Sequence, residues 1–202
     1  MEKTIFLFRR KDGVSRDEFA QHYIQVHAPL GKRLTRCLLG YTVNLVQNRE
    51  SPDSVTEHWV PAAMDILTPS KAYASMQDFE QVFTDDRSFI GDMDLYVAGK
   101  EEHVVAAEPL DAPLGQETGE AKAIWFYKGS GDVPPPPPGA RRVIDNHISR
   151  KMVYRNDGHW DSLAPDISVI RMAWAPDFES FGVDLTDAVR VREYRFVPAP
   201  DW

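Results

Sequence analysis

The sequence predicts an α+β protein built from ferredoxin-like units, in which strands and helices follow one another in the order βαββαβ. Two observations carry this prediction. Strand-like and helix-like spacings of apolar residues alternate in that order over residues 3–105. Strand patterns then return four times between residues 123 and 197, with little helix between them. The chain is therefore expected to hold a second unit in tandem with the first.

The first strand and the first helix are the clearest predicted elements. Residues 3–10 (KTIFLFRR) are rich in aromatic and branched side chains and end at a turn-like Lys-Asp-Gly. Ser15 is a good N-cap, and apolar residues at helical spacing predict a helix over residues 15–34. Pro29 lacks a backbone N–H, so we expect a kink or break near Val26 to Ala28.

Shorter patterns predict the rest of the first unit. Strands are expected over residues 38–48, 55–60 and 92–105, a mainly helical stretch over 70–83 and a short turn over 86–92. In the strand over 55–60, alternation places Thr56, His58 and Val60 on one face. The same alternation places Glu57 and Trp59 on the other face, so Glu57 and His58 cannot form a simple acid–base pair.

The second half is predicted to be a degenerate copy of the first. Residues 108–122 are polar, contain Pro and Gly, and are expected to link a domain at 1–107 to a second unit at 123–202. Its four strands are expected over residues 123–128, 140–149, 166–176 and 188–197. Laying the second strands over each other aligns Asn44 with Asn146.

Proline marks the difference between the halves. Of 15 prolines, 11 follow residue 107, and Pro134 to Pro138 are consecutive. They stand where the second unit should have its first helix, and polyproline is extended because each ring removes an N–H and clashes with a preceding turn. The second unit is therefore predicted to lack that helix.

Charge and composition exclude several functions. The net charge is −8, divided evenly between the two sides of residue 107, so no basic patch is expected to bind nucleic acid. No apolar stretch approaches the ~20 residues of a membrane span, and we expect no membrane partner. Cys37 is the only cysteine, which excludes an intrachain disulfide and favours a reducing, cytoplasmic setting.

Cofactor and metal motifs are absent from the sequence. There is no GxGxxG, P-loop, HExxH or GxSxG pattern. The six histidines include no HxH or HxxxH pair, so we expect no metal site. Any chemistry is expected to proceed without a cofactor.

One segment, FRRKDGVSRDEFAQHYIQVHAPLGKRL, resembles EthD-domain proteins of the dimeric α+β barrel superfamily, most specifically in HYIQVHAPL. GYTVN and TEHWV are similar to that family's second and third strands, and the resemblance covers residues 3–105. It implies an EthD-like domain at 1–107 and ferredoxin-like units paired through their sheets into an α+β barrel, with a pocket between helices and sheet. With both units in one chain, the barrel would close within one polypeptide. Further assembly of such chains into a homodimer is compatible with this arrangement.

The catalytic candidates are His27, His147 and Tyr23. His27 lies in the HAPL segment one turn beyond Tyr23, and a histidine can act as general acid or base near neutral pH. The alternative is that His27 only packs at the helix end. His147 follows Asn146 and matches the Asn-His pair of some enzymes in the resembling family. Tyr23 is expected in the core, with a hydroxyl that can reach substrate.

Substrate contacts are predicted for Asn44, Glu57, His58, Trp59, Trp125, Tyr127, Asn146 and Arg171. Mid-strand Asn is disfavoured, so Asn44 and Asn146 are expected to make specific hydrogen bonds, to the protein or to a ligand. Glu57 is expected to pair with an arginine such as Arg9 or Arg171, as a structural ion pair rather than a catalytic group.

Arg171 and two aromatic residues complete the candidate set. Arg171 lies in an apolar strand and needs an anionic partner, for which a protein carboxylate is favoured over a substrate carboxylate. Trp125 and Tyr127 share a strand face and suit stacking on an aromatic ligand, with core packing as the alternative.

These residues predict a cofactor-independent lyase or isomerase with decarboxylase- or dehydratase-like proton transfer on a small hydrophobic aromatic substrate. His27 or His147 would move the proton, Tyr23 and Asn44 would orient the substrate, and Arg171 would hold an anionic group. Relatives of the resembling family also include cofactor-free monooxygenases and proteins without established activity. A monooxygenase and a non-catalytic ligand-binding or accessory protein therefore stay open as alternatives.

Overall fold

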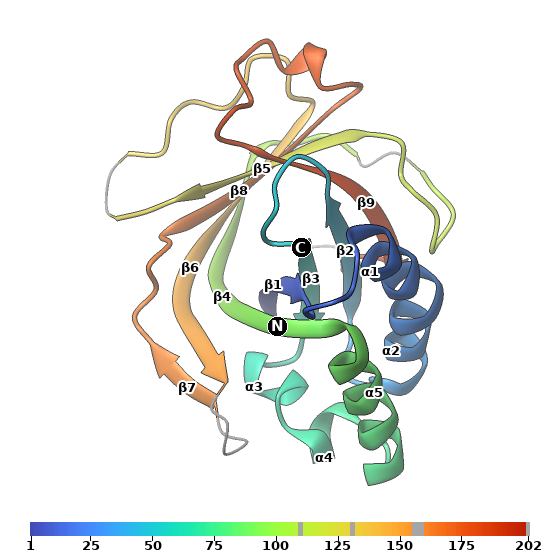
Figure 1. The fold of residues 1–202 in the computed structure, drawn as a ribbon. Helices are drawn as coiled ribbons and strands as arrows, with labels where there is room; N and C mark the ends of the chain where they lie inside the picture. Colours follow the sequence, from blue (N-terminus) through green and yellow to red (C-terminus); the bar gives the residue numbers. More distant parts are fainter. Residues whose placement is uncertain (109–110, 130–131, 155–159, 201–202) are drawn as a thin grey trace.

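A computed structural model describes residues 1–108, 111–129, 132–154 and 160–200. The described residues form nine strands: β1 (Glu2–Arg10), β2 (Gly40–Val46), β3 (Ser54–Val60), β4 (Ile90–Val105), β5 (Ala121–Tyr127), β6 (Arg142–Tyr154), β7 (Trp160–Leu163), β8 (Val169–Ala175) and β9 (Val189–Val197). Eight of them close into an antiparallel barrel, because β6 pairs with β4 at the other end of the sheet (Figure 1). β7 pairs only with β6.

The barrel uses one strand order twice. The first four strands are hydrogen-bonded in the order β4-β1-β3-β2, and the next four in the order β9-β5-β8-β6. Each run therefore places its own fourth, first, third and second strands side by side, which is the ferredoxin-like order. β2 joins β9 and β4 joins β6, so each run covers the free edges of the other. The predicted α+β barrel is confirmed.

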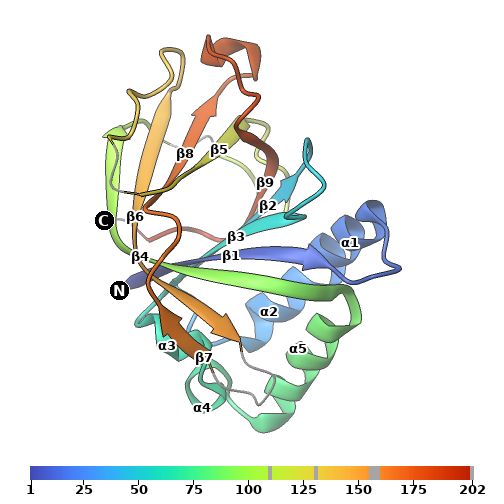
Figure 2. The same ribbon diagram turned by 60° about the vertical axis from the view of Figure 1, so that its left-hand side comes forward.

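The α-helices of the described residues lie on one side of the barrel. The helical segments are α1 (Arg16–His22), η1 (Tyr23–His27), α2 (Ala28–Leu34), α3 (Ala63–Ile66), α4 (Pro69–Ala72), α5 (Met76–Phe89) and the short η2 (Glu179–Phe181). α1, α2 and α5 lie outside β1 and β4 (Figure 2). No helix of the described residues is long and apolar enough to cross a membrane.

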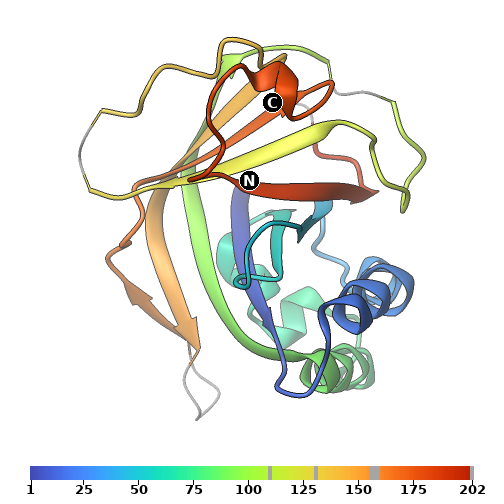
Figure 3. The same ribbon diagram turned by 45° about the horizontal axis from the view of Figure 1, so that its top comes forward.

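Extended segments and the single short helix η2 cover the other side. In Figure 3 the chain around 132–141 and 176–188 runs over the strands of the second half. Phe181 and Leu185 pack there with buried alanines and Val143, and Gly139 donates its N–H to the carbonyl of Phe181 at 3.4 Å. Within the described part of the chain, the connection between β5 and β6 contains no helix, as the proline run predicts.

The first predicted helix forms as three consecutive segments. Ser15 caps it, because its hydroxyl accepts the Glu18 N–H and the Glu18 carboxylate accepts the Ser15 N–H. The predicted kink is a π-helical turn over Tyr23–His27, in which the N–H of Ala28 reaches back to the carbonyl of Tyr23. The wider turn comes just before Pro29, which has no N–H to continue the regular pattern.

The mainly helical stretch predicted over 70–83 forms as two helices, and the second runs six residues past the predicted end. α4 covers the start of the stretch expected over 70–83 and α5, from Met76 to Phe89, covers the rest, while the turn expected over 86–92 belongs to α5 and the start of β4. Ser75 starts α5 by accepting the Asp78 N–H at 3.1 Å. The chain before it is extended at Tyr73, which forms a β-bridge with Thr35. The short strand β7 was not predicted.

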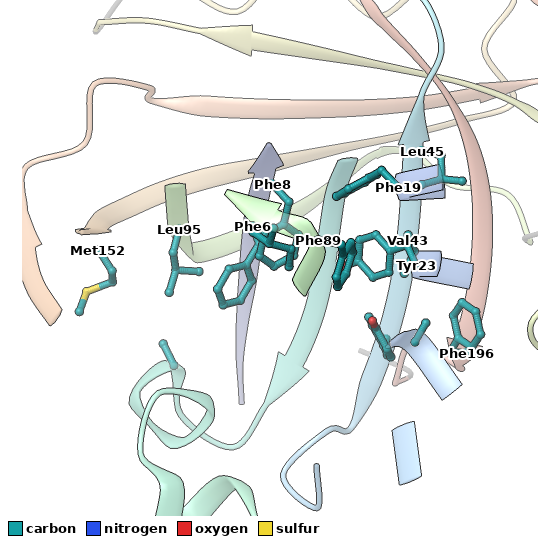
Figure 4. Packing of buried hydrophobic residues seen from close by; sticks show 14 of the residues in the cluster. Phe6, Phe8, Phe19, Tyr23, Val43, Leu45, Phe89, Leu95, Met152 and Phe196 are labelled. Atoms are coloured by element: carbon teal, nitrogen blue, oxygen red, sulfur yellow. The ribbon is translucent and has the colours of Figure 1, made fainter. Parts of the chain in front are cut away.

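Two apolar layers lie on opposite faces of the sheet. Side-chain alternation in β1 places Phe6 and Phe8 against the helices, where they pack with Phe19, Tyr23 and Phe89 (Figure 4). The alternate residues of β1, such as Ile5 and Leu7, face the barrel interior and pack with side chains from both halves, including Ile124, Ile170 and Met172. Each fully buried side chain of this size stabilises the fold by roughly 1.5–3 kcal/mol.

Candidate functional site

The π-helical turn brings two histidines onto one carboxylate. His22 Nε2 lies 2.8 Å from Asp85 Oδ1, and His27 Nδ1 lies 2.9 Å from Asp85 Oδ2. The two histidines are five positions apart, a spacing that suits a π-turn, because its i→i−5 hydrogen bonds add one residue to the turn. Such turns occur frequently at functional sites.

His27 is the buried member of this pair. Its side chain is 9% exposed, and its ring lies 5.1 Å from the Tyr23 ring and 5.2 Å from the Phe89 ring. Its second nitrogen, Nε2, lies 3.5 Å from Asp86 Oδ1. Burial alone would raise the pKa of Asp85, but the hydrogen bonds from His27 and His22 lower it below its usual value. Asp85 is therefore an ionised acceptor for both rings.

The predicted residues Tyr23 and His58 lie in the same layer, between the helices and the sheet. The Tyr23 hydroxyl hydrogen-bonds to Thr56 Oγ1 at 2.7 Å, and burial raises the pKa of Tyr23. His58 packs against the rings of Tyr41 and Phe6. Burial, and secondarily the charge of His27, lowers the pKa of His58 to about 3, so this ring is neutral near pH 7.

A surface hollow of about 440 Å³ opens beside the histidine pair. Its lining combines apolar, amide and hydroxyl side chains with one imidazole and one carboxylate, and consists of Gly13, Val14, Glu18, Gln21, His22, Gln25, Val26, Ser88 and Phe89. The His22 side chain is 31% exposed there, and its ring lies 4.6 Å from the Phe89 ring. Among the described residues, no group of three or more His, Cys, Asp and Glu is arranged to hold a metal ion.

Glu57 lies in the barrel interior, and its predicted pairing with an arginine is wrong. Its carboxylate accepts from Lys122 at 2.6 Å and from Asn44 at 2.9 Å, and lies 2.8 Å from Lys3 Nζ. The two arginines that were expected have other partners: Arg9 pairs with Asp92 and Asp94, and Arg171 with Asp145. Arg171 follows the interior-facing Ile170 and lies on the outer face of β8, so the barrel wall separates it from Glu57.

The interior repeats one arrangement in both halves. Lys3 Nζ lies 4.5 Å from the Trp59 ring centroid, and Lys122 Nζ lies 4.4 Å from that of Trp174. Each lysine faces its tryptophan across a paired strand, β1 with β3 and β5 with β8. The predicted residue Trp59 thus belongs to a buried cation–π pair.

Asn44 and Asn146 also occupy equivalent places. Asn44 Nδ2 donates to the Val55 carbonyl at 2.7 Å, and Asn146 Nδ2 donates to the Ile170 carbonyl at 2.8 Å. Both side chains are fully buried, and both make the specific hydrogen bonds that their mid-strand positions predict. A contact of either residue with substrate stays a prediction.

Arg171 has a protein carboxylate as its partner, the alternative that the sequence favoured. Its Nε and one terminal nitrogen each donate to Asp145 at 2.7 Å, and the other terminal nitrogen donates to the Pro134 carbonyl at 2.6 Å. The guanidinium lies 5.7 Å from the Tyr127 ring. The Trp125 ring lies 6.2 Å from that of Phe181, so these candidates lie on the outer face of the second half.

The structure does not bring His147 together with His27. His147 is on β6, opposite Lys100 of β4, and its side chain is 40% exposed. Its Nε2 lies 3.1 Å from Glu102 Oε2, another exposed side chain. His147 is thus a surface residue on the barrel wall, outside the layer that holds His27, Tyr23 and His58.

Sequence reasoning missed His22, Asp85 and the two interior lysines. The five-residue spacing of His22 and His27 just before a proline is a signal for a π-turn. The lysines carry a repeat signal, because Lys3 and Lys122 each stand two residues before an isoleucine in the first strand of their half. No local pattern marks Asp85, because only packing of α5 against η1 brings it to the histidines.

Comparison with known proteins shows likeness in fold. No protein-family model matches the chain, and no curated protein matches it. Among solved structures, an anthrone oxidase-like protein superposes with a TM-score of 0.54 at 8% identity, over 98% of this chain and 94% of its own. A chlorite dismutase-like protein gives a TM-score of 0.44 at 10% identity, over 95% of this chain and 94% of its own. EthD family membership stays a prediction, and the chain has an α+β fold built on an eight-stranded antiparallel barrel, like that of the anthrone oxidase-like protein.

Proposed function

We propose that the protein is a cofactor-independent enzyme that transfers protons on a small hydrophobic aromatic substrate, as a lyase or isomerase does. One observation carries this proposal: the ionised Asp85 carboxylate orients two imidazoles, those of His22 and His27, beside an open hollow. An imidazole oriented by a carboxylate is a common general base, because the carboxylate fixes the tautomer and stabilises the imidazolium that forms.

The surrounding residues support this chemistry. Phe89 lies against both histidine rings, and Tyr23 lies against His27, so one side of the pair is closed to water. A site partly closed to water strengthens the interaction between Asp85 and an imidazolium. Positioned general acid–base groups contribute roughly 10²–10⁴-fold to rate, which is the contribution assigned to this pair.

A cofactor-free oxygenase or oxidase is the second candidate. The likeness over nearly the whole chain to an anthrone oxidase-like protein favours it. The same base would remove a proton from an acidic aromatic substrate, and the resulting anion would be oxidised by dioxygen. The two candidates share the first step and differ in whether oxygen is consumed.

Asp85→Asn tests the proposed function. The protein would be incubated with hydroxylated aromatic acids, hydroxylated aromatic ketones and anthrone, with product mass, CO2 release and O2 uptake as readouts. We expect turnover by the wild type and a loss of about 10²-fold or more in kcat for Asp85→Asn. Glu80→Gln removes an exposed carboxylate from the same helix and should leave turnover unchanged.

The outcomes separate the candidates. Product formation without O2 uptake supports a lyase or isomerase, and product formation that requires O2 supports the oxygenase. Wild-type turnover that survives Asp85→Asn at full rate refutes the role of the histidine pair. No turnover above buffer on any compound, by any readout, refutes the enzyme and favours a ligand-binding protein.

A further inference from the structure

Of the two histidines that share Asp85, only one has a ring nitrogen without a carboxylate partner. His27 has a carboxylate oxygen near each nitrogen, Asp85 at 2.9 Å and Asp86 at 3.5 Å. His22 uses only Nε2, which contacts Asp85 at 2.8 Å. Across the described residues, no hydrogen bond or ion pair joins His22 Nδ1 to another group. His22 therefore has the nitrogen that can bind a ligand.

The two histidines also differ in how exposed they are to a ligand. The His22 side chain is 31% exposed and lines the hollow of about 440 Å³, whereas the His27 side chain is 9% exposed and does not line it. A ligand in the hollow meets His22 first. His27 stands behind it, against the Phe89 ring.

The lining of the hollow selects the ligand by shape and charge. Val14 and Val26 provide apolar surface, and the buried Phe89 ring forms the apolar floor of the hollow behind them. The volume is in the range of small-molecule sites. Glu18 also lines the hollow, and with Asp85 behind His22 the local charge is negative, which disfavours a carboxylate ligand. A neutral aromatic hydroxyl compound fits these conditions.

We propose that the hollow beside α1 binds a neutral aromatic hydroxyl compound and that His22 Nδ1 accepts its hydroxyl proton. This rests on the proposed function and names its substrate class and its base. The O–H bond breaks, the electron pair stays on the aromatic oxygen, and the proton forms the N–H bond at Nδ1. The imidazolium is stabilised by Asp85 at Nε2, and the proton returns to the product.

His27 is then a positioning residue. It holds Asp85 from the buried side through Nδ1, while Asp86 lies at its other nitrogen. Around the pair, Asp85 and Asp86 of α5 contact the imidazoles, Tyr23 of η1 packs on the His27 ring, and Glu18 lines the hollow with His22. The π-turn provides the offset that lets both imidazoles reach Asp85 from one helical segment.

Nitrogen NMR with 2-naphthol as the probe tests this assignment. Protein labelled with ¹⁵N in histidine would be titrated with 2-naphthol at pH 7, and with 2-naphthoate as the charged analogue. We expect a saturable shift of His22 Nδ1 with 2-naphthol and at least tenfold weaker binding of 2-naphthoate. His22→Asn should weaken 2-naphthol binding at least tenfold, whereas His103→Asn, at an exposed histidine outside the hollow, should not.

His27→Asn provides the readout for positioning. It should leave the 2-naphthol affinity within about threefold of wild type but change the tautomer signal of His22, because Asp85 loses its second donor. A merely structural His27 would leave that signal unchanged in a folded variant, which would overturn its positioning role.

The results distinguish this assignment from the proposed function. Shifts at His27 or His58 in place of His22, or no saturable shift at any histidine, overturn the assignment. If Asp85→Asn abolishes turnover while 2-naphthol leaves His22 unshifted, the enzyme stands and the assignment fails. If 2-naphthol binds at His22 but no compound is turned over, the site stands and the proposed function fails.

Discussion

Replacing Glu57 by Gln tests how the barrel interior is stabilised. Glu57 contacts Lys3, Lys122 and Asn44, and all four residues are almost completely buried. Gln keeps the shape of the side chain and removes its charge. The variant therefore isolates the ionic part of the interaction.

The expected loss of stability depends on which carboxylate partners Lys3 and Lys122 keep in the variant. Burial opposes ionisation of Glu57, but Lys122 and Lys3 together hold its pKa far below its usual range. Removing one partner of a buried ion pair typically costs ~3–5 kcal/mol. Lys3 keeps Glu101 and Lys122 keeps Glu193, so we expect the low end, about 3 kcal/mol, or roughly 6–12 °C in Tm.

Urea unfolding followed by tryptophan fluorescence measures this loss. Glu102→Gln is the matched control, because Glu102 is half exposed and contacts only exposed partners, so solvent screens its charge and its loss should leave stability nearly unchanged. The folded-state pKa of Glu57 lies below its unfolded value, so its contribution is present above about pH 4.3 and is lost as the pH falls further. The difference between wild type and Glu57→Gln should shrink accordingly. A Glu57→Gln protein as stable as Glu102→Gln at pH 7 would refute this account.

Two further predictions concern buried groups. His58→Phe should reduce the fall in unfolding free energy as the pH is lowered. Between about pH 6.5 and 3 only the unfolded state protonates His58, so the wild type loses up to ~1.4 kcal/mol of stability per pH unit, and the variant lacks this loss. Urea unfolding at several pH values measures it, and an unchanged slope would contradict it. Arg171→Met should cost about 3 kcal/mol because Asp145 stays buried without its partner. It should also speed limited proteolysis within 132–141, since the Pro134 carbonyl loses its donor, and wild-type resistance would count against this.

The two halves of the barrel match in strand order but differ outside it. The interior pairs Lys3–Trp59 and Lys122–Trp174 match closely, whereas the helices that carry His22 and His27 have no counterpart in the described residues after β5. The division into a domain at 1–107, a linker and a second unit stays a prediction. So do a homodimer and a cytoplasmic location.

Local patterns predicted the elements whose causes are local. Ser15 with Glu18 starts the first helix, and Pro29 disrupts it where its missing N–H requires. The predicted element boundaries were wrong where contacts between distant residues determine them. Tyr73 is held extended by its bridge to Thr35, so α5 starts later than its helical spacing alone indicates.

The candidate site was predicted only in part for the same reason. The sequence identified His27 and Tyr23, because both lie in one recognisable segment. It misassigned the partner of Glu57, because alternation gives the face of a strand but not which of several cations lies across the barrel. Asp85 is far from His27 in sequence and was found only through the packing of α5 against η1.

By itself, the sequence determined the strand order of each half, the two faces of each strand and the absence of a helix at the proline run. These depend on side-chain period and on backbone chemistry within a few residues. Only the tertiary structure decided that the barrel closes through β4 and β6, that Lys3 and Lys122 share Glu57, and that Asp85 joins His22 to His27. Contacts between distant segments decide these features, because ions and hydrogen-bonding groups are buried only where the whole fold supplies their partners.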